Sequence, residues 1–152
     1  QAERKKSVKY KLVPQELEIR DKKVLIVDDS IVRGNTSREI VRMLKDFGAK
    51  EVYFAVACPP VKSPCFYGVD MPTKSELIAG NMNEDEIGKY LEVDALLYQN
   101  IDDLVEAVTR KGDHHIDTPC MACLDGNYVV NDIDEAKIAE METMRVNDRN
   151  GK

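Results

Sequence analysis

The chain has 152 residues, a length that fits one ordinary domain and leaves little room for two. Hydrophobic residues make up 43% of it and charged residues 33%, a globular balance that excludes wholesale disorder, collagen-like repeats and disulfide-knot miniproteins. The net charge of -6 argues against sequence-independent binding of nucleic acid, and no apolar run approaches the ~20 residues that span a bilayer.

The first residues are basic, and the chain begins with Gln rather than Met. Residues 7–12, SVKYKL, alternate apolar and polar side chains, which is the period-two pattern of a strand with one wet face. Arg4, Lys5 and Lys6 precede that strand, where they either meet an anionic ligand or form a solvated strand end. Because this basic stretch has no element before it, we interpret the sequence as a fragment of a longer protein.

Residues 24–57 predict one strand, helix, strand unit with a parallel crossover. Val24 to Val27 are a continuous apolar run, as expected of a strand that is buried on both faces of a parallel sheet. Thr36 or Ser37 is the expected N-cap of a helix that ends at Gly48. A second apolar strand follows at residues 51–57, EVYFAVA, so the fold class is α/β.

The second half of the chain predicts shorter elements. A Pro-rich loop is followed by two capping-box pairs that begin short helices, Thr73 with Glu76 and Asn83 with Glu86. Residues 95–98, ALLY, predict a third short buried strand, and Ile101–Arg110 predicts an amphipathic helix. The last predicted helix covers Asp134–Arg145. Together the elements indicate a parallel sheet flanked by helices, with a helical C-terminal tail.

The most informative segment is VLIVDDSIVRGNTS, residues 24–37, in which a strand ends on two acids and a glycine-bearing loop opens a helix. Ligands of open parallel sheets bind at this edge of the sheet. Thr36 and Ser37 stand beside the free N–H groups of the first helical turn, which favour a phosphate, and Gly34 lets the backbone approach it. Asp28 and Asp29 suit ribose hydroxyls or a divalent cation. The loop therefore predicts a site for a ribose 5-phosphate.

Three other interpretations compete for this segment. An acidic surface turn after a strand is common. A response-regulator receiver also opens with a strand that ends on acids, but it requires a phosphate-accepting Asp after a later strand, and residues 54–58, FAVAC, have none. A nucleotide-binding glycine loop is disfavoured because neither GxGxxG nor GxxxxGK followed by Ser or Thr is present.

Residues 27–40, VDDSIVRGNTSREI, resemble the phosphoribosyl pyrophosphate signature of the type I phosphoribosyltransferase family, in the form that glutamine phosphoribosylpyrophosphate amidotransferases carry. Three further stretches are similar to that family: RKKSVKYKL at residues 4–12 to the end of its mobile active-site loop, YGVDMP with SELIA at residues 67–79, and GNYV at residues 126–129. The resemblance covers nearly the whole chain.

The resemblance implies transfer of the phosphoribosyl group from 5-phosphoribosyl 1-pyrophosphate to ammonia derived from glutamine, the first step of purine (IMP) biosynthesis. It assigns Asp28 and Asp29 as the catalytic acids, which hold the ribose hydroxyls and Mg²⁺. Lys5 and Lys6 are implied to neutralise the departing pyrophosphate. The other implied substrate-binding residues are Ser30, Ile31, Val32, Arg33, Gly34, Asn35, Thr36 and Ser37. Arg33 has an alternative role, in which it points away from the phosphate and pairs with an acid.

The resemblance also implies a type I phosphoribosyltransferase-like sheet that is incomplete at its N-terminus. We expect residues 1–112 to be the C-terminal part of the phosphoribosyltransferase domain and residues 113–152 to be an extension with one helix. A glutaminase domain is missing, so we expect no glutamine-dependent activity from this chain alone. Two other functions stay open: a phosphoribosyl pyrophosphate- or nucleotide-binding module without catalysis, and another type I phosphoribosyltransferase.

Four cysteines in a chain without an export signal suggest reduced thiols, so we expect a cytoplasmic protein with neither a nucleic-acid nor a membrane partner. Cys120 and Cys123 form a CxxC pair, and Cys65 lies in PCFYG. Some members of the family bind a four-iron four-sulfur cluster through similarly placed cysteines, which makes these three residues candidate ligands. The resemblance further implies purine nucleotides as feedback inhibitors and a homo-oligomer for the complete enzyme.

Overall fold

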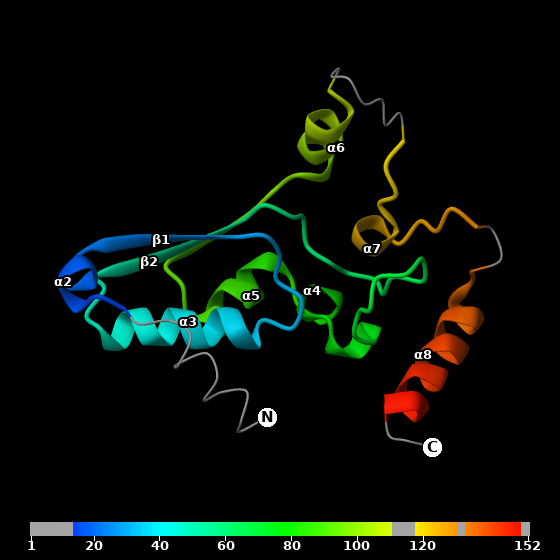
Figure 1. Cartoon of the computed structure of the whole chain (residues 1–152), viewed down its shortest axis with the longest axis horizontal. Helices are drawn as coiled ribbons and strands as arrows, with labels where there is room; N and C mark the ends of the chain where they lie inside the picture. Colours follow the sequence, from blue (N-terminus) through cyan, green and yellow to red (C-terminus); the bar gives the residue numbers. More distant parts are fainter. Residues whose placement is uncertain (1–13, 111–117, 131–132, 150–152) are drawn as a thin grey trace.

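The computed structural model describes residues 14–110, 118–130 and 133–149 (Figure 1). The predicted strand at residues 7–12 lies outside them, as do Lys5 and Lys6. The elements follow in this order: α2 (Glu16–Ile19), β1 (Lys23–Asp28), α3 (Asn35–Asp46), β2 (Glu51–Val56), η1 (Lys74–Glu76), α4 (Ile78–Asn81), α5 (Glu84–Leu91), β3 (Ala95–Tyr98), α6 (Ile101–Thr109), α7 (Ala122–Asp125) and α8 (Glu135–Arg149).

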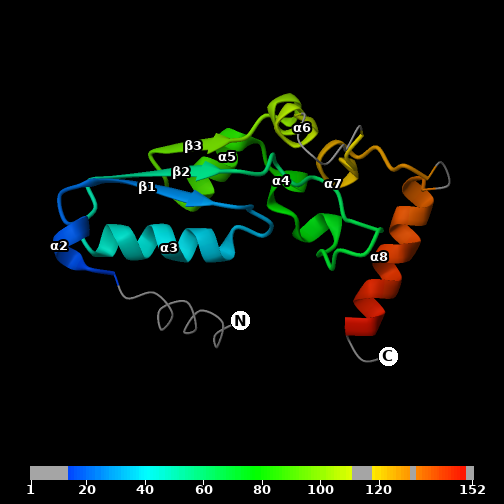
Figure 2. The same cartoon turned by 45° about the horizontal axis from the view of Figure 1, so that its top comes forward.

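The three strands form one parallel sheet in the order β1-β2-β3, which confirms the α/β prediction (Figure 2). Each strand pair is joined by a helical crossover, as parallel pairing requires. The register pairs Val27 with Ala55 and Ala55 with Leu97, so the carboxyl ends of the three strands meet at one edge. The loop after β1 starts at that edge.

One face of the sheet forms the main core. Val52, Phe54 and Val56 of β2 are buried on this face. They pack with two helices on the same side of the strands, α3 through Val41 and Leu44, and α5 through Ile87 and Leu91. Phe54 has 0% of its surface exposed, so this face supplies most of the apolar burial that stabilises the sheet.

The opposite face of the sheet is open in the described part of the chain, which corrects the expectation of strands buried on both faces. Leu25 is 58% exposed, Val27 71% and Leu97 56%. The apolar runs predict the strands correctly, but hydrophobicity alone does not say whether a second layer covers them. The burial of β1 instead alternates between exposed and half-buried residues.

The crossover between β2 and β3 contains both predicted capping boxes. The Glu76 carboxylate accepts the N–H of Thr73 at the start of η1, and that of Glu86 accepts the N–H of Asn83 at the start of α5. Beyond the carboxyl ends of the strands, a second apolar cluster forms around Val61, Leu77 and Leu124. This cluster connects the crossover to α6 and α7.

The C-terminal segment contains the predicted helix, which runs as α8 from Glu135 to Arg149, and also the short helix α7, which was not predicted. The short helix α2 was likewise not predicted. Arg145 of α8 donates to the carbonyl oxygen of Cys65, and its guanidinium lies 5.1 Å from the centre of the Phe66 ring. The domain boundary at residue 112 stays a prediction. Among the described residues no helix is both long and apolar enough to cross a membrane.

Candidate functional site

The loop after β1 places the start of α3, which no side chain caps, at the carboxyl edge of the sheet. Gly34 is the N-cap of α3 and has φ +74°, so the predicted caps Thr36 and Ser37 were wrong. A left-handed backbone is readily adopted only by glycine, which explains why the helix begins here. No side chain caps this helix start, and its first turn contains no acid. The N–H groups of Asn35, Thr36 and Ser37 therefore remain available to an anion.

A cavity of about 800 Å³ surrounds this helix start. It brings together most of the residues that the sequence singled out, along with five that it did not. The predicted residues that line it are Asp28, Ser30, Val32, Arg33, Gly34, Asn35, Thr36 and Ser37; the others are Arg38, Glu39, Arg42, Glu76 and Tyr90.

The acidic pair lies at the end of β1. Asp28 lines the cavity, and its Oδ1 accepts the N–H of Asp29 at 3.0 Å. Asp29 is exposed beside the cavity, where its Oδ1 accepts the hydroxyl of Ser30 at 3.1 Å. The main chain here is fixed to the residues that follow β2, because the carbonyls of Asp28 and Asp29 accept the N–H groups of Ala57 and Cys58.

Of the predicted substrate-binding residues that the structure describes, Asp29 and Ile31 do not line the cavity. Ile31 is 2% exposed and belongs to the main core, so its side chain anchors the loop. Asp29 lies just outside the lining, as described above. Ser37 is 5% exposed and lines the cavity from within the first turn of α3.

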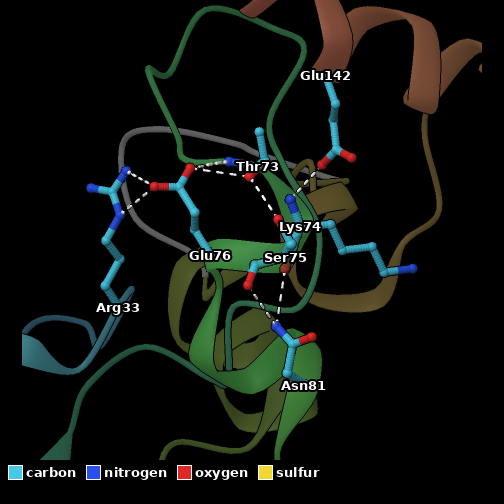
Figure 3. Close-up of polar contacts among 7 residues, drawn as sticks. All are labelled: Arg33, Thr73, Lys74, Ser75, Glu76, Asn81 and Glu142. Atoms are coloured by element: carbon cyan, nitrogen blue, oxygen red, sulfur yellow. Dashed lines mark hydrogen bonds and ion pairs between the residues drawn. The ribbon is translucent and has the colours of Figure 1, made fainter. Parts of the chain in front are cut away.

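The loop is braced by the crossover that follows β2. The carbonyl of Val32 accepts the N–H of Ile78 at 2.9 Å. The next residue, Arg33, donates from Nε at 3.1 Å and from Nη2 at 2.8 Å to Oε1 of Glu76 (Figure 3). Arg33 is thus paired with an acid while it also lines the cavity, and its contact with a substrate stays a prediction.

Glu76 is held as a carboxylate by its neighbours. Its partial burial alone raises the pKa, but hydrogen bonds from the N–H and hydroxyl of Thr73, and from Arg33, outweigh that effect. The net result is a pKa below the usual value for a glutamate. The group is thus ionised at neutral pH, when its bonds to Arg33 and Thr73 are charge-assisted.

The wall of the cavity along α3 is basic and aromatic. The Tyr90 hydroxyl of α5 donates to Oδ1 of Asn35 at 3.0 Å, and the Arg38 guanidinium lies 4.5 Å from the centre of the Tyr90 ring. Arg38 and Arg42 both pair with Glu92. Sequence patterns missed this wall because it joins two distant segments, α3 and the end of α5, and the hydrogen bonds between them span 50 to 55 positions.

The four cysteines are free thiols in the described part of the chain. No three His, Cys, Asp or Glu residues are grouped to hold a metal ion anywhere in the described ranges, which include Cys65, Cys120 and Cys123. The Sγ of Cys65 accepts the N–H of Tyr67 at 3.3 Å. Burial raises the pKa of Cys123, with a smaller contribution from the neighbouring thiols, so its thiolate form is disfavoured. The assignment of Cys65, Cys120 and Cys123 as iron–sulfur ligands stays a prediction.

Comparisons with known proteins point to one family. A model described as the phosphoribosyl transferase domain matches residues 1–71. The amidophosphoribosyltransferase of Methanocaldococcus jannaschii is 48% identical over 128 residues, which are 84% of this chain and 26% of that protein. That of Pseudomonas aeruginosa is 47% identical over 145 residues, which are 95% of this chain and 29% of that protein.

Solved structures agree with these relatives. The glutamine phosphoribosylpyrophosphate amidotransferase of Bacillus subtilis, in complex with ADP and GMP, superposes with a TM-score of 0.68 at 35% identity over 87% of this chain and 31% of that one. A structure described as the allosteric regulatory enzyme of purine biosynthesis gives a TM-score of 0.71 at 35% identity over 90% of this chain and 30% of that one. The chain thus spans about a quarter to a third of the length of these relatives.

Proposed function

The chain belongs to the phosphoribosyltransferase family by sequence and by fold, and we propose that it carries the phosphoribosyl pyrophosphate site of an amidophosphoribosyltransferase. The proposed reaction transfers the phosphoribosyl group to ammonia that is derived from glutamine. Its product, 5-phosphoribosylamine, begins the synthesis of IMP.

One observation carries this proposal: a single cavity is lined both by Asp28 at the end of β1 and by the uncapped first turn of α3. The two ends of the cavity suit opposite ends of the same ligand. Open N–H groups and the helix dipole favour the 5-phosphate. The Asp28 carboxylate accepts hydrogen bonds, so it suits the ribose hydroxyls, which donate them. It does not suit the phosphate, which has no hydrogen bond to donate.

In the proposed reaction the nitrogen lone pair of ammonia forms a bond to C1 of the ribose while the bond from C1 to the pyrophosphate oxygen breaks. Pyrophosphate leaves with that electron pair, and the new amine releases one proton. Positive charge develops on the sugar as the bond breaks, so the negative charge of Asp28 stabilises it. Asn35, Thr36 and Ser37 act by orientation, because they fix the 5-phosphate and hence C1.

Magnesium is part of the proposal. Mg²⁺ is usually held by one or two carboxylates together with substrate phosphates, so Asp28 and Asp29 suffice as protein ligands. The adjacent placement of the two aspartates at the cavity edge fits this donor set. The ion would neutralise charge on the pyrophosphate.

Three further parts of the proposal concern partners and place. Purine nucleotides inhibit by feedback, which the ADP and GMP bound to the Bacillus subtilis relative support. Lys5 and Lys6, which lie outside the described residues, would neutralise charge on the departing pyrophosphate. The complete enzyme is a homo-oligomer of the cytoplasm, where the four free thiols would stay reduced.

Titration calorimetry of the 152-residue chain with phosphoribosyl pyrophosphate tests the proposal, with and without Mg²⁺. Ribose 5-phosphate serves as a second ligand. We expect both to bind, and Asp28→Asn to weaken the Mg²⁺-dependent binding of phosphoribosyl pyrophosphate at least roughly tenfold, because losing even a hydrogen-bonding partner of a metal ligand costs about that much. Without Mg²⁺ the same variant should change the binding of ribose 5-phosphate less, because the asparagine oxygen still accepts a hydrogen bond from a ribose hydroxyl and a charge that repels the phosphate is gone.

Asp46→Asn is the matched control, since this aspartate is exposed at the other end of α3. It should leave both affinities unchanged. If neither ligand binds the wild-type chain, or if Asp28→Asn leaves the Mg²⁺-dependent affinity intact, the proposed function is wrong. Measuring phosphoribosylamine formation with ammonia then separates catalysis from binding alone, because a binding module would bind without turnover.

A further inference from the structure

The carboxylate of Glu76 connects the loop to the crossover through different oxygens. Oε1 accepts both donors of Arg33, whereas Oε2 accepts the N–H of Thr73 at 3.0 Å and its hydroxyl at 3.1 Å (Figure 3). Arg33 belongs to the loop, and Thr73 begins η1. One side chain thus fixes two segments that are 40 residues apart, and it does so beside the open amides of α3.

Further hydrogen bonds hold the η1 turn to which Glu76 belongs. The Thr73 hydroxyl also bonds to the Ser75 hydroxyl at 3.1 Å, and Asn81 Nδ2 donates to the carbonyls of Lys74 and Ser75. From the C-terminal helix, Glu142 accepts the N–H of Lys74 (Figure 3). The support on which Glu76 rests is therefore a hydrogen-bonded unit, not a free loop.

We propose that Glu76 is a positioning residue of the anion site: by holding Arg33 to the η1 turn, it fixes the loop so that the N–H groups of residues 35–37 converge on the ligand. This inference rests on the proposed function and adds to it a residue that is not expected to touch the substrate. Partly exposed ion pairs stabilise little by themselves, and Arg33 and Glu76 are 38% and 39% exposed. Their expected contribution is the geometry of the loop.

The sign of the effect separates positioning from charge. Glu76 lines the cavity, so removing its negative charge should by electrostatics alone strengthen the binding of an anion. Glu76→Gln retains the shape of the side chain but leaves one acceptor oxygen, which cannot serve both Arg33 and Thr73. If Glu76 positions the loop, the variant binds ribose 5-phosphate about three- to tenfold more weakly in a calorimetric titration, the effect of a lost charge-assisted contact.

Glu51→Gln is the matched control. This glutamate also pairs with a cation and a hydroxyl, Lys23 and Tyr53, but at the amino end of the strands. It should leave the affinity unchanged. The double variant Arg33→Gln with Glu76→Gln should bind ribose 5-phosphate no more weakly than the single variant that has the lower affinity. The two effects do not add, because both changes break the same link.

Amide spectra of the ligand-free chain give a readout that does not depend on the proposed function. The ¹H–¹⁵N signals of residues 34–37 should move in Glu76→Gln and stay in place in Glu51→Gln. Unchanged signals, or ribose 5-phosphate binding that is unchanged or tighter in Glu76→Gln, would overturn the positioning role. Failure of the wild-type chain to bind ribose 5-phosphate would instead refute the proposed function, while the amide signals still decide the role of Glu76.

Discussion

Gly34 is the residue on which the shape of the anion site depends most directly. Its φ of +74° is a conformation that disfavours side chains, and a Cβ placed there would lie 2.7 Å from Cδ1 of Ile78 and 3.3 Å from Cε1 of Tyr90. Both neighbours belong to the segments that brace the loop. The glycine therefore lets the backbone turn and lets the crossover pack against it.

We predict that Gly34→Ala abolishes detectable binding of ribose 5-phosphate and lowers the free energy of unfolding by about 1–3 kcal/mol, the range for a strained residue at positive φ. Calorimetric titration and chemical denaturation measure the two effects. Gly126→Ala is the control, because Gly126 has φ +80° but its added Cβ would meet only Ser63 Oγ at an ordinary 3.5 Å. It should be destabilised without any loss of binding, and a Gly34→Ala variant that binds normally would contradict the prediction.

At this scale the sequence predicts the parts of the site that are local. Asp28, Gly34 and Thr36 lie within one short segment, and strand-end acids before a helix start are a pattern that can be recognised. Glu76 and Tyr90 were missed as site residues because they reach the loop from 43 and 55 positions away. The sequence does predict the capping role of Glu76. That role uses only one carboxylate oxygen, Oε2, and does not predict which residue contacts Oε1.

Among the elements, α3 and α5 are fixed to each other by the last turn of α5. Glu92 ends α5 with φ +65°, and its carboxylate takes hydrogen bonds from Arg42 and Arg38 of α3. These bonds, that of Arg42 first, hold the pKa of Glu92 below its ordinary value of 4.5. The ionised form is favoured in the folded chain, so the pairing stabilises the fold above that pH.

We predict that Glu92→Gln lowers the melting temperature at pH 7, and that its difference from the wild type shrinks as the pH falls below 4.5. The sign follows because a carboxylate with a lowered folded-state pKa loses its stabilising effect on protonation. Thermal unfolding from pH 7 to pH 3 measures it. A difference that stays constant or grows with acidification would show that the ion pairs are not its cause.

Glu92→Gly separates the backbone from the charge. It loses the same ion pairs as Glu92→Gln, but glycine adopts the left-handed conformation without strain. We therefore predict a melting temperature for Glu92→Gly that is higher than that of Glu92→Gln by a few degrees, measured under the same conditions. Equal or lower values would mean that position 92 carries no backbone strain.

Element prediction succeeded where a pattern is long or has its own boundary signals. The parallel unit of β1, α3 and β2 follows from two apolar runs around a helical period, and α5 from its capping box. The N-cap of α3 was predicted two or three residues too late, at Thr36 or Ser37, because hydroxyl side chains are the commoner caps and the left-handed Gly34 serves instead. The four-residue helices α2 and α7 were missed because they are too short to show a period.

For the whole molecule, the sequence predicts the sheet but not which face of it has a partner. The burial of Val52, Phe54 and Val56 and the exposure of Leu25, Val27 and Leu97 arise from equally apolar strands. The difference is set by where the crossover helices pack, which is a property of the chain path. The register places Val27 and Leu97 on either side of Ala55, so the exposed residues are contiguous.

We predict that this open face makes the isolated chain self-associate as its concentration rises, because contiguous exposed apolar surface drives association. Sedimentation velocity over a range of concentrations measures it. Val27→Thr retains the branched shape and strand preference of the 71% exposed valine while adding a hydroxyl, so it should shift the association to higher concentration. Val129→Thr changes an equally exposed valine, at 73%, outside the sheet, and should leave the association unchanged. A wild-type chain that stays monomeric throughout, or equal effects of the two variants, would show that the open face does not drive association.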